Sequence, residues 1–205
     1  MPASDTAVPP RHDPLPTVRD AVPADHAAIR EVVVAAYGQY AAVLAPEVFL
    51  RYLADLLDLD RHARYGRLLV AEVAGRVRGS AAFYPDSSVQ GFGWPAGWAG
   101  GRGLAVHPAA RGQGVAGALL AACERLARSL GATVFAFHTG SFMTSAIGLY
   151  ERLGYRKAPE FDVDMNAHYG MADGPPTMAI AYVRRLTATA RASRTARHHT
   201  PRSAA

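Results

Sequence analysis

Apolar residues near the start of the chain predict a short strand at 17–21, followed by two amphipathic helices. The first helix opens at Pro23 and Asp25, because an early proline and an acid in the first turn are typical of a helix start. The second helix follows Pro46. In each helix, apolar residues recur at spacings of three and four, which indicates one buried face. These residues are Ile29, Val32, Val33, Ala36 and Tyr37 in the first helix, and Phe49, Tyr52, Leu53, Leu56 and Leu57 in the second.

Beyond residue 66, alternating or continuous apolar runs predict six more strands. The first two of these are expected to form a β-hairpin, because the segment between them is short and contains glycine. The third strand is interrupted by glycines, and the last two are expected to alternate between two faces of a sheet. The strands are predicted at 67–73, 77–84, 98–106, 133–138, 161–165 and 177–185.

Two more helices are predicted between these strands, one at 113–130 and one that ends at Leu153. Ser141 or Thr144 is the expected N-cap of the later helix, and a glycine follows each helix. A helix between two neighbouring strands forms a β-α-β unit, which requires parallel strands and a right-handed crossover. The predicted fold class is α/β: a mixed, mostly antiparallel central sheet with a parallel β-α-β core and helices on both faces.

The chain has 205 residues, half of them apolar, which predicts one domain at 17–186 between tails at 1–16 and 187–205. The net charge of +5 is concentrated in the second tail, since 18 basic residues face 17 acidic ones without it. We expect this tail to be disordered and solvated, with contact to RNA as the alternative. A nucleic-acid partner is therefore not expected for the domain.

The single cysteine, Cys123, excludes an intramolecular disulfide and a cysteine-based zinc site. Because Cys123 falls in a helical pattern, we expect it to be a small buried hydrophobe rather than a nucleophile. No segment has the apolar length needed to span a bilayer, and residues 1–16 lack the apolar stretch of a signal peptide. These features predict a cytoplasmic protein with no metal and no membrane partner.

A glycine-rich turn leads directly from the strand at 98–106 into the helix at 113–130. Helix N-termini leave unpaired N–H groups and carry a partial positive charge, so they favour phosphate. Gly112, Gly114 and Gly117 allow a ligand to approach the backbone, and Arg111 adds a fixed cation. A phosphate-binding turn is therefore favoured over a tight connection that merely uses glycine.

The same glycines also fit the dinucleotide fingerprint GxGxxG, but that match alone is weak. Five residues separate Val106 from Gly112, whereas the fingerprint places its glycines close behind the strand. The fingerprint also needs an acid about 20 residues on, and the segment 135–138 has none. A P-loop is excluded because no Gly-Lys-Ser/Thr follows.

The segment LAVHPAARGQGVAG at 104–117 resembles the central motif of the GNAT superfamily of acyl-CoA-dependent N-acyltransferases, Q/R-x-x-G-x-G/A. Arg111, Gly114 and Ala116 fill its defined positions. A second block, AIGLYERLGY at 146–155, is similar to the next helix and strand start of that family. The resemblance extends over about 17–186, although only these two blocks are specific.

The resemblance implies that two central parallel strands splay apart and hold the pantetheine of acetyl-CoA between them. The backbones of Leu104, Ala105 and Val106 are then expected to face pantetheine. It also implies direct attack of an amine on the thioester, with Tyr150 as the acid that protonates the leaving thiolate. The residues expected at the pyrophosphate are Arg111, Gly112, Gln113, Gly114, Val115, Ala116 and Gly117.

The sequence departs from the family pattern in two places. Many relatives carry a carboxylate in the strand before Leu104, but the segment 99–103 has no acid. Met143 stands where many relatives have an asparagine that contacts pantetheine. The base must therefore come from solvent or from another residue, and the candidates are Glu72, Asp86, His138, Asp162 and Asp164.

The resemblance also implies an acceptor site formed from the first two helices and from loops at the edges of the sheet. Asp162 and Asp164 alternate with apolar residues, so both should point to one face of a strand, either toward the cleft or toward solvent. Aromatic residues with a few acids suit a cationic amine. The candidate residues are Tyr37, Tyr40, Trp94, Trp98, Asp162, Asp164, His168 and Tyr169.

The predicted function is an N-acetyltransferase that passes the acetyl group of acetyl-CoA to a primary amine of a small molecule or peptide. The alternative is a non-catalytic domain that binds or senses acyl-CoA. The expected partner is the amine acceptor, and the resemblance is compatible with a homodimer.

Overall fold

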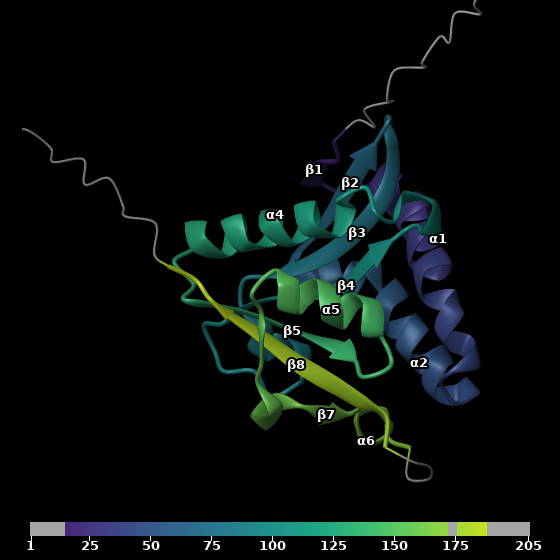
Figure 1. Cartoon of the computed structure of the whole chain (residues 1–205), viewed down its shortest axis with the longest axis vertical. Helices are drawn as coiled ribbons and strands as arrows, with labels where there is room; N and C mark the ends of the chain where they lie inside the picture. Colours follow the sequence, from purple (N-terminus) through teal and green to yellow (C-terminus); the bar gives the residue numbers. More distant parts are fainter. Residues whose placement is uncertain (1–14, 172–175, 188–205) are drawn as a thin grey trace, which may run out of the picture.

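The structure is a computed structural model that describes residues 15–171 and 176–187. The predicted tails lie outside the described residues, apart from 15, 16 and 187. The strands of the described part form one sheet in the order β1-β2-β3-β4-β5-β8-β6, with β7 also paired to β8 (Figure 1). They are β1 (Thr17–Asp20), β2 (Arg67–Val73), β3 (Arg76–Tyr84), β4 (Ala99–Val106), β5 (Val134–Gly140), β6 (Arg156–Lys157), β7 (Val163–Asp164) and β8 (Met178–Arg185).

Helices cover both faces of this sheet, and the sheet separates the hydrophobic core into two parts. The core on one face joins α1 and α2 to Leu68 and Val70 of β2, and the core on the other face joins α4 and α5 to Leu69 and Ala71. Alternate residues of β2 thus enter opposite cores, which is why this strand is apolar throughout. The helices are α1 (His26–Tyr37), α2 (Pro46–Leu57), α3 (Leu59–Tyr65), α4 (Val115–Ser129), α5 (Thr144–Arg152) and α6 (Met165–His168).

The structure confirms the predicted fold class, because β4 and β5 are the one parallel pair in an otherwise antiparallel sheet of the described residues. The predicted buried face of α1 is also confirmed, since its five residues are all buried. In α2 only Leu56 of the predicted residues is fully buried, and Val48 joins it. None of the described helices has the length and apolar character needed to cross a membrane.

The central parallel strands separate soon after they meet. They pair only at Ala99 with Phe135 and at Gly100 with Ala136, and then β4 stays with β3 while β5 stays with β8. A β-bulge helps to turn β4 away, because the register with β3 shifts between Ala82 and Ser80 and leaves an extra residue on β4. The divergence leaves a gap in the middle of the sheet.

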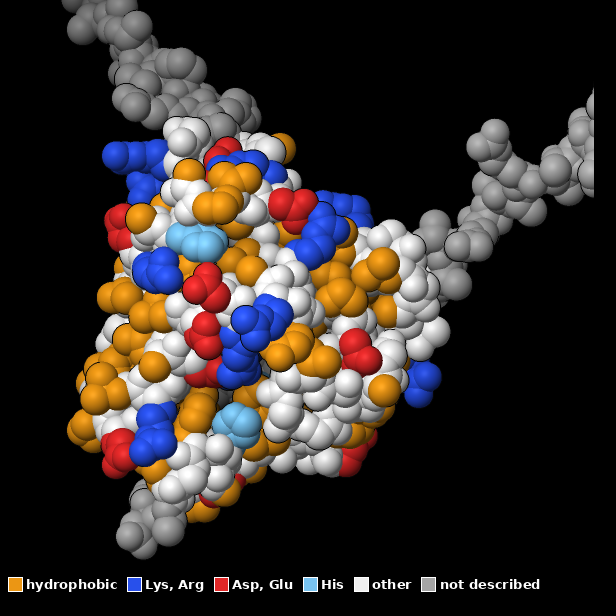
Figure 2. Space-filling view, turned by 180° about the vertical axis from the view of Figure 1, so that it is seen from behind, with side chains coloured by type: hydrophobic (Ala, Val, Ile, Leu, Met, Phe, Trp, Pro, Cys, Tyr) orange, Lys and Arg blue, Asp and Glu red, His pale blue; other side chains and the backbone are white. Residues whose placement is uncertain are grey.

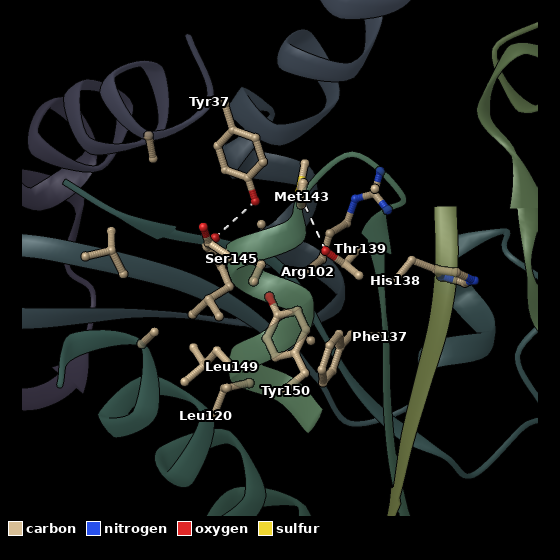
Figure 3. A pocket seen from close by; sticks show the side chains of 18 of the residues that line it. Tyr37, Arg102, Leu120, Phe137, His138, Thr139, Met143, Ser145, Leu149 and Tyr150 are labelled. Carbon is tan, nitrogen blue, oxygen red and sulfur yellow. Dashed lines mark hydrogen bonds between the residues drawn. The ribbon is translucent and has the colours of Figure 1, made fainter. Parts of the chain in front are cut away.

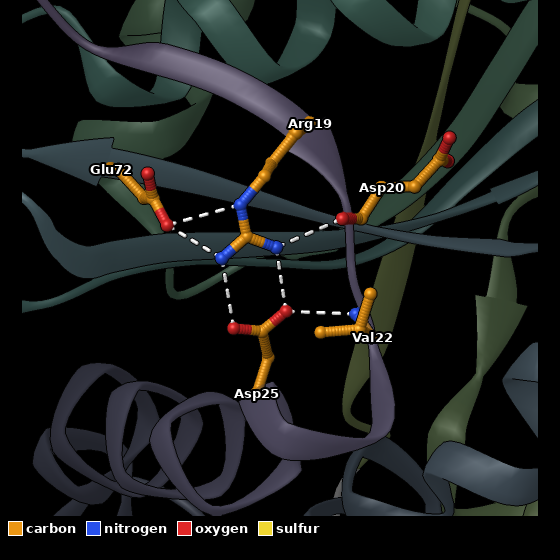
Figure 4. A network of polar contacts seen from close by, with 5 residues as sticks. All are labelled: Arg19, Asp20, Val22, Asp25 and Glu72. Carbon is orange, nitrogen blue, oxygen red and sulfur yellow. Dashed lines mark hydrogen bonds and ion pairs between the residues drawn. The ribbon is translucent and has the colours of Figure 1, made fainter.

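A buried carboxylate fixes the start of α1 to the edge of the sheet (Figure 4). Arg19 on β1 donates to Asp25 (Nη1 to Oδ2, 2.6 Å) and to Glu72 on β2 (Nε to Oε1, 3.0 Å). Asp25 also accepts from the N–H of Val22, and these donors, Arg19 above all, lower the pKa of its carboxyl to about 2. Glu72, one of the candidate bases, is thus occupied in holding β1 to β2.

Several local predictions were wrong. The strand predicted at 161–165 is a 3₁₀ turn, the two-residue strand β7 and the start of α6. Asp164 caps α6 by accepting from the N–H of Asn166 at 3.0 Å, and this cap ends the strand. The helix α5 begins at Thr144 with Met143 as N-cap and has no side-chain cap from Ser141 or Thr144.

The sequence pattern also missed α3. Asp58 caps this helix by accepting from the N–H of Arg61, and His62 and Arg64 lie in its last turn. Both are helix signals, but the apolar spacing used to find helices needs a longer segment. The 3₁₀ turns are η1 (Pro23–Asp25), η2 (Gly38–Ala42), η3 (Ser87–Gln90), η4 (Pro108–Ala110) and η5 (Pro159–Phe161).

The side of the molecule formed by α1 and α2 carries apolar side chains at its surface (Figure 2). Val34 on α1, Val43 after η2 and Leu50 on α2 are about half exposed or more. Isolated surface apolar residues are common in monomeric proteins. The homodimer remains a prediction.

Candidate functional site

A cleft of about 650 Å³ occupies the gap between β4 and β5 (Figure 3). Its walls come from α1 and α2 on one face, from α4 and α5 on the other, and from the segment after α6. This volume lies in the usual range for small-molecule and cofactor sites. Nine of the predicted site residues line it: Leu104, Val106, Arg111, Gly112, Gly114, Val115, Ala116, Gly117 and Tyr150.

Two predicted site residues do not line the cleft with their side chains. Ala105 is buried in the core beneath α1, because alternate residues of β4 point to opposite faces. Gln113 turns its side chain back, and its Nε2 donates weakly to the carbonyl of Ala109 at 3.4 Å. Any role of these two residues toward a ligand is therefore a role of their backbones.

One end of the cleft is a cradle of backbone N–H groups at the start of α4. Gly112 (φ +80°) and Gly114 (φ +79°) both adopt the left-handed conformation, which requires glycine. Neither N–H makes a backbone hydrogen bond among the described residues, and the first turn of a helix leaves its own N–H groups free. The exposed Arg111 stands beside them and forms no ion pair with the described residues. The arrangement suits an anion such as pyrophosphate.

Gly117 differs from the other glycines of this turn, because its backbone is helical and does not require glycine. A Cβ at this position would meet nothing within 4 Å, so packing does not require glycine either. Gly117 lines the cleft in the first turn of α4. The missing side chain leaves room for a ligand close to the helix.

Tyr150 projects from α5 into the middle of the cleft (Figure 3). Its ring packs on Phe137 of β5, with 4.5 Å between the ring centroids, and only 5% of the residue is exposed. Burial raises the pKa of its phenol well above the ordinary value, the charges of Tyr37 and Tyr40 add to this, and Thr139 partly opposes it. Tyr150 therefore keeps its proton at neutral pH and can act as a proton donor.

Two polar groups of the cleft wall are already satisfied within the chain. The hydroxyl of Tyr37 donates to the carbonyl of Leu104 at 3.0 Å, across the gap between α1 and β4. The hydroxyl of Thr139 donates to the sulfur of the buried Met143 at 3.6 Å. Met143 thus packs against β5 and offers no amide to a ligand.

None of the described residues that line the cleft is Asp or Glu. The expectation that Asp162 and Asp164 share a strand face was wrong, because only Asp164 lies in a strand, β7, while Asp162 follows η5. Both carboxylates accept hydrogen bonds from the backbone. Asp162 accepts from the N–H of Ala181 at 2.7 Å, and Asp164 caps α6. Asp86 caps η3 in the same way, by accepting from the N–H of Ser88 at 2.9 Å.

His138 is the one proposed base that lines the cleft. Its Nε2 lies 2.8 Å from the carbonyl of Phe161, so this nitrogen carries the proton, and its ring rests against Trp94. Burial, with a contribution from Arg102, lowers the pKa of His138 to about 4. His138 is therefore neutral and a weak base at pH 7.

The end of the cleft away from the glycine turn contains a charged cluster that the sequence analysis missed. Arg102 on β4 pairs with Asp55 on α2, and Arg61 on α3 pairs with the other oxygen of Asp55 at 3.0 Å. The guanidinium of Arg102 also lies over the ring of Phe92, with its carbon 4.4 Å from the ring centroid. The sequence did contain one signal for this cluster, namely an arginine within a predicted strand of small and apolar residues.

Four of the predicted acceptor residues line the cleft, namely Tyr37, Tyr40, His168 and Tyr169. Trp94 and Trp98 instead pack with Phe161 in a separate apolar cluster against Ala136 of β5 and Ala181 of β8. Cys123 is buried, and burial raises the pKa of its thiol to about 12. This agrees with its predicted role as a buried hydrophobe.

A parallel pair that splays beside a glycine-opened helix, with a buried tyrosine in the gap, is the arrangement that the resemblance to the GNAT superfamily implied. The family model described as the acetyltransferase (GNAT) family matches residues 25–155. The chain belongs to the GNAT acetyltransferase family.

Solved structures share this fold. A GCN5-related N-acetyltransferase from Rhodopseudomonas palustris is 21% identical, with a TM-score of 0.61 over 85% of this chain and 98% of that one. The yncA structure of Salmonella typhimurium, with its cofactor acetyl-CoA, is 24% identical, with a TM-score of 0.55 over 86% and 97%. A GNAT family acetyltransferase from Brucella melitensis in complex with acetyl-CoA is 28% identical, with a TM-score of 0.50 over 69% and 82%. No curated protein matches the chain.

Proposed function

We propose that the protein transfers the acetyl group of acetyl-CoA to a primary amine. The observation that carries the proposal is a single cleft that joins a backbone phosphate cradle at Gly112–Gly117 to a buried, protonated phenol at Tyr150. Acetyl-CoA supplies a thioester, and several solved structures of this fold contain it. The cleft volume of about 650 Å³ suits a pantetheine arm and a small acceptor.

The residues of the cleft divide the work between binding and proton transfer. The N–H groups at the start of α4, with Arg111, hold the pyrophosphate. At Leu104 and Val106, β4 has no neighbouring strand on the side of the cleft, because β4 and β5 have already separated there. This edge of β4 faces the pantetheine. Tyr150 lies on the opposite wall, on α5, where it faces the thioester.

The reaction is a direct displacement. The nitrogen of the neutral amine forms a bond to the thioester carbonyl carbon, the carbon–sulfur bond breaks, and Tyr150 donates its proton to the leaving sulfur. The amine releases its own proton to water, and the phenol is restored from the same source. None of the described lining residues is a carboxylate that could serve as the base, so solvent takes this role.

The absence of a carboxylate from the described lining also favours a second function, a domain that binds acyl-CoA without catalysis. The two functions predict different results with the same reagents. Both give a thermal shift with CoA, but only the enzyme releases CoA thiol when an amine is added.

The test combines ligand-induced stabilisation with thiol release. CoA at about 100 times its Kd should stabilise the fold by about 2.7 kcal/mol, and NAD at the same concentration should not. Gly114→Glu should remove the CoA shift through charge and steric repulsion. Gly131→Glu is the matched control, because Gly131 also has a positive φ (+81°) but lies beyond the far end of α4. A shift with NAD alone would falsify the proposal.

A further inference from the structure

The acceptor end of the cleft has a positive charge that its own residues do not neutralise. Asp55 is the single carboxylate shared by Arg61 and Arg102, so the three side chains together carry one excess positive charge. Arg102 lines the cleft, whereas Asp55 and Arg61 are not among the residues that line it. The excess charge therefore faces the cleft.

Two buried donors at this end also have no hydrogen-bond partner among the described residues. They are Nε of Arg102, whose side chain is 9% exposed, and Nε2 of Gln90, which is 5% exposed. Both residues line the cleft. A buried donor without an acceptor destabilises the folded protein, so a ligand that supplies oxygen acceptors here gains binding energy.

Aromatic rings hold the guanidinium of Arg102 in place. The ring of Phe92 lies under the guanidinium at 4.4 Å, and the ring of His168 stacks on Phe92 at 4.3 Å between centroids. With Asp55 on one edge and Phe92 on one face, the position of Arg102 is defined before a ligand binds. A fixed guanidinium favours a planar anion with two oxygens, which is a carboxylate.

The polarity of the cleft opposes a simple cationic amine. Its charged lining residues are Arg102, Arg111 and Arg152, and none of the described lining residues is acidic. These charges repel an ammonium ion, but they attract an anionic group carried on the same molecule. They also favour the neutral form of a bound amine, which is the form that attacks the thioester.

We infer that the acceptor is an amino acid or a similar small amino carboxylate, whose carboxylate binds at Arg102 while its amine reaches the thioester near Tyr150. The inference rests on the proposed acetyl transfer and adds the substrate class. Arg102 acts as a specificity-determining residue. The sequence prediction of acids that attract a cationic amine is thereby replaced by an arginine that attracts an anion.

The first experiment compares acceptors that differ only in the carboxylate, such as phenylalanine with phenethylamine and leucine with isopentylamine, at equal concentrations of free amine. The kcat/KM of the amino acid should exceed that of its partner by about 10- to 100-fold, the value of one charge-assisted contact. Equal values, or preference for the plain amine, would overturn the inference. Absence of thiol release with every acceptor would instead contradict the proposed acetyl transfer.

The second experiment compares Arg102→Gln with Arg61→Gln. Both variants remove one arginine from Asp55, but only Arg102 lines the cleft. Arg102→Gln should lower kcat/KM for the amino acid much more than for the plain amine, so that the preference for the amino acid is lost. Arg61→Gln should keep the preference for the amino acid. An equal loss of kcat/KM for both acceptors in Arg102→Gln would assign Arg102 a structural role. If this variant does not fold, the comparison of acceptors with the wild-type protein still tests the inference.

Discussion

Tyr150 and Tyr155 lie close together on the chain and in space, yet their surroundings prepare them for different roles. The ring centroids are 6.2 Å apart, and both side chains are buried. The hydroxyl of Tyr155 donates to the carboxylate of Glu124 at 2.6 Å, whereas Tyr150 faces the cleft. One phenol is committed to the core and the other is available for a reaction.

This difference predicts that replacing each tyrosine with phenylalanine affects a different property of the protein. Tyr150→Phe should lower kcat by about 10²–10⁴-fold and leave acetyl-CoA affinity similar, because only the proton is removed. Tyr155→Phe should lower the free energy of unfolding by about 1–3 kcal/mol and keep kcat, because it removes a hydrogen bond from the buried Glu124. Steady-state kinetics and urea unfolding measure the two effects. An unchanged kcat in Tyr150→Phe would make Tyr150 a packing residue.

Gly117 provides a residue-scale test of ligand approach. Glycine within a helix is about 1 kcal/mol less favourable than alanine, and a Cβ at this position meets no other atom within 4 Å. Gly117→Ala should therefore raise the free energy of unfolding by about 0.5–1 kcal/mol while it weakens CoA binding. Calorimetric titration and thermal unfolding separate these two effects.

Gly148→Ala is the matched control for Gly117→Ala. Gly148 also lies within a helix, α5, but it does not line the cleft, and its added Cβ meets only the mobile end of Arg152 at 3.3 Å. The control should gain similar stability and keep CoA affinity. If Gly117→Ala also kept CoA affinity, no ligand would pass close to this residue.

At the scale of elements, the bulge in β4 decides where the cleft opens. Gly103 adopts φ +63° at the bulge, and its α-carbon faces Leu56 of α2, so an added Cβ would lie 3.3 Å from that side chain. β4 pairs with β5 before the bulge and separates from it afterwards. The conformation of one glycine thus contributes to the gap that forms the site.

Gly103→Ala should lower both stability and activity. A non-glycine residue in the left-handed region costs about 1–2 kcal/mol, and relief of this strain would shift β4 and the groups that line the cleft. Gly75→Ala, in the turn between β2 and β3, has a similar φ of +73° and open space for its Cβ. The control should lose comparable stability and retain kcat/KM. Equal activity of the two variants would show that the bulge does not shape the site.

At the scale of the whole molecule, a buried and a partly buried histidine on different elements link stability to pH. His62 on α3 lies 2.5 Å from the hydroxyl of Tyr84, and His138 on β5 contacts the carbonyl of Phe161. Burial lowers the pKa of each to about 4, whereas an unfolded histidine has a pKa of about 6.5. Below about pH 6.5 the two histidines become protonated in the unfolded chain but stay neutral in the folded chain.

The sign of this linkage predicts loss of stability on acidification. The full stability is present above about pH 6.5 and decreases as the pH falls toward 4, by about 1–2 kcal/mol per histidine at pH 5. His62→Gln and His138→Gln remove the titrating groups, so each should flatten the dependence of Tm on pH between 4 and 6.5. An unchanged slope in both variants would show that other groups set the acid sensitivity.

The sequence alone was sufficient for the fold class, for most elements and for the glycine turn before α4, since each depends on local signals. Helical spacing identified the buried face of α1, and the two glycines with positive φ in the turn before α4 lie two positions apart in one motif. Periodicity and backbone freedom are properties of neighbouring residues, so they can be read without knowing the fold.

Only the tertiary structure decided the charged end of the cleft. Arg102, Asp55 and Phe92 come from a strand, a helix and a loop, and their contacts join residues up to 47 positions apart. Asp162 and Asp164 were predicted at the site because they alternate with apolar residues. In the structure each carboxylate instead accepts a hydrogen bond from a backbone N–H group. Pairing of charges and capping of short helices depend on which segments meet in space, and no local pattern determines that.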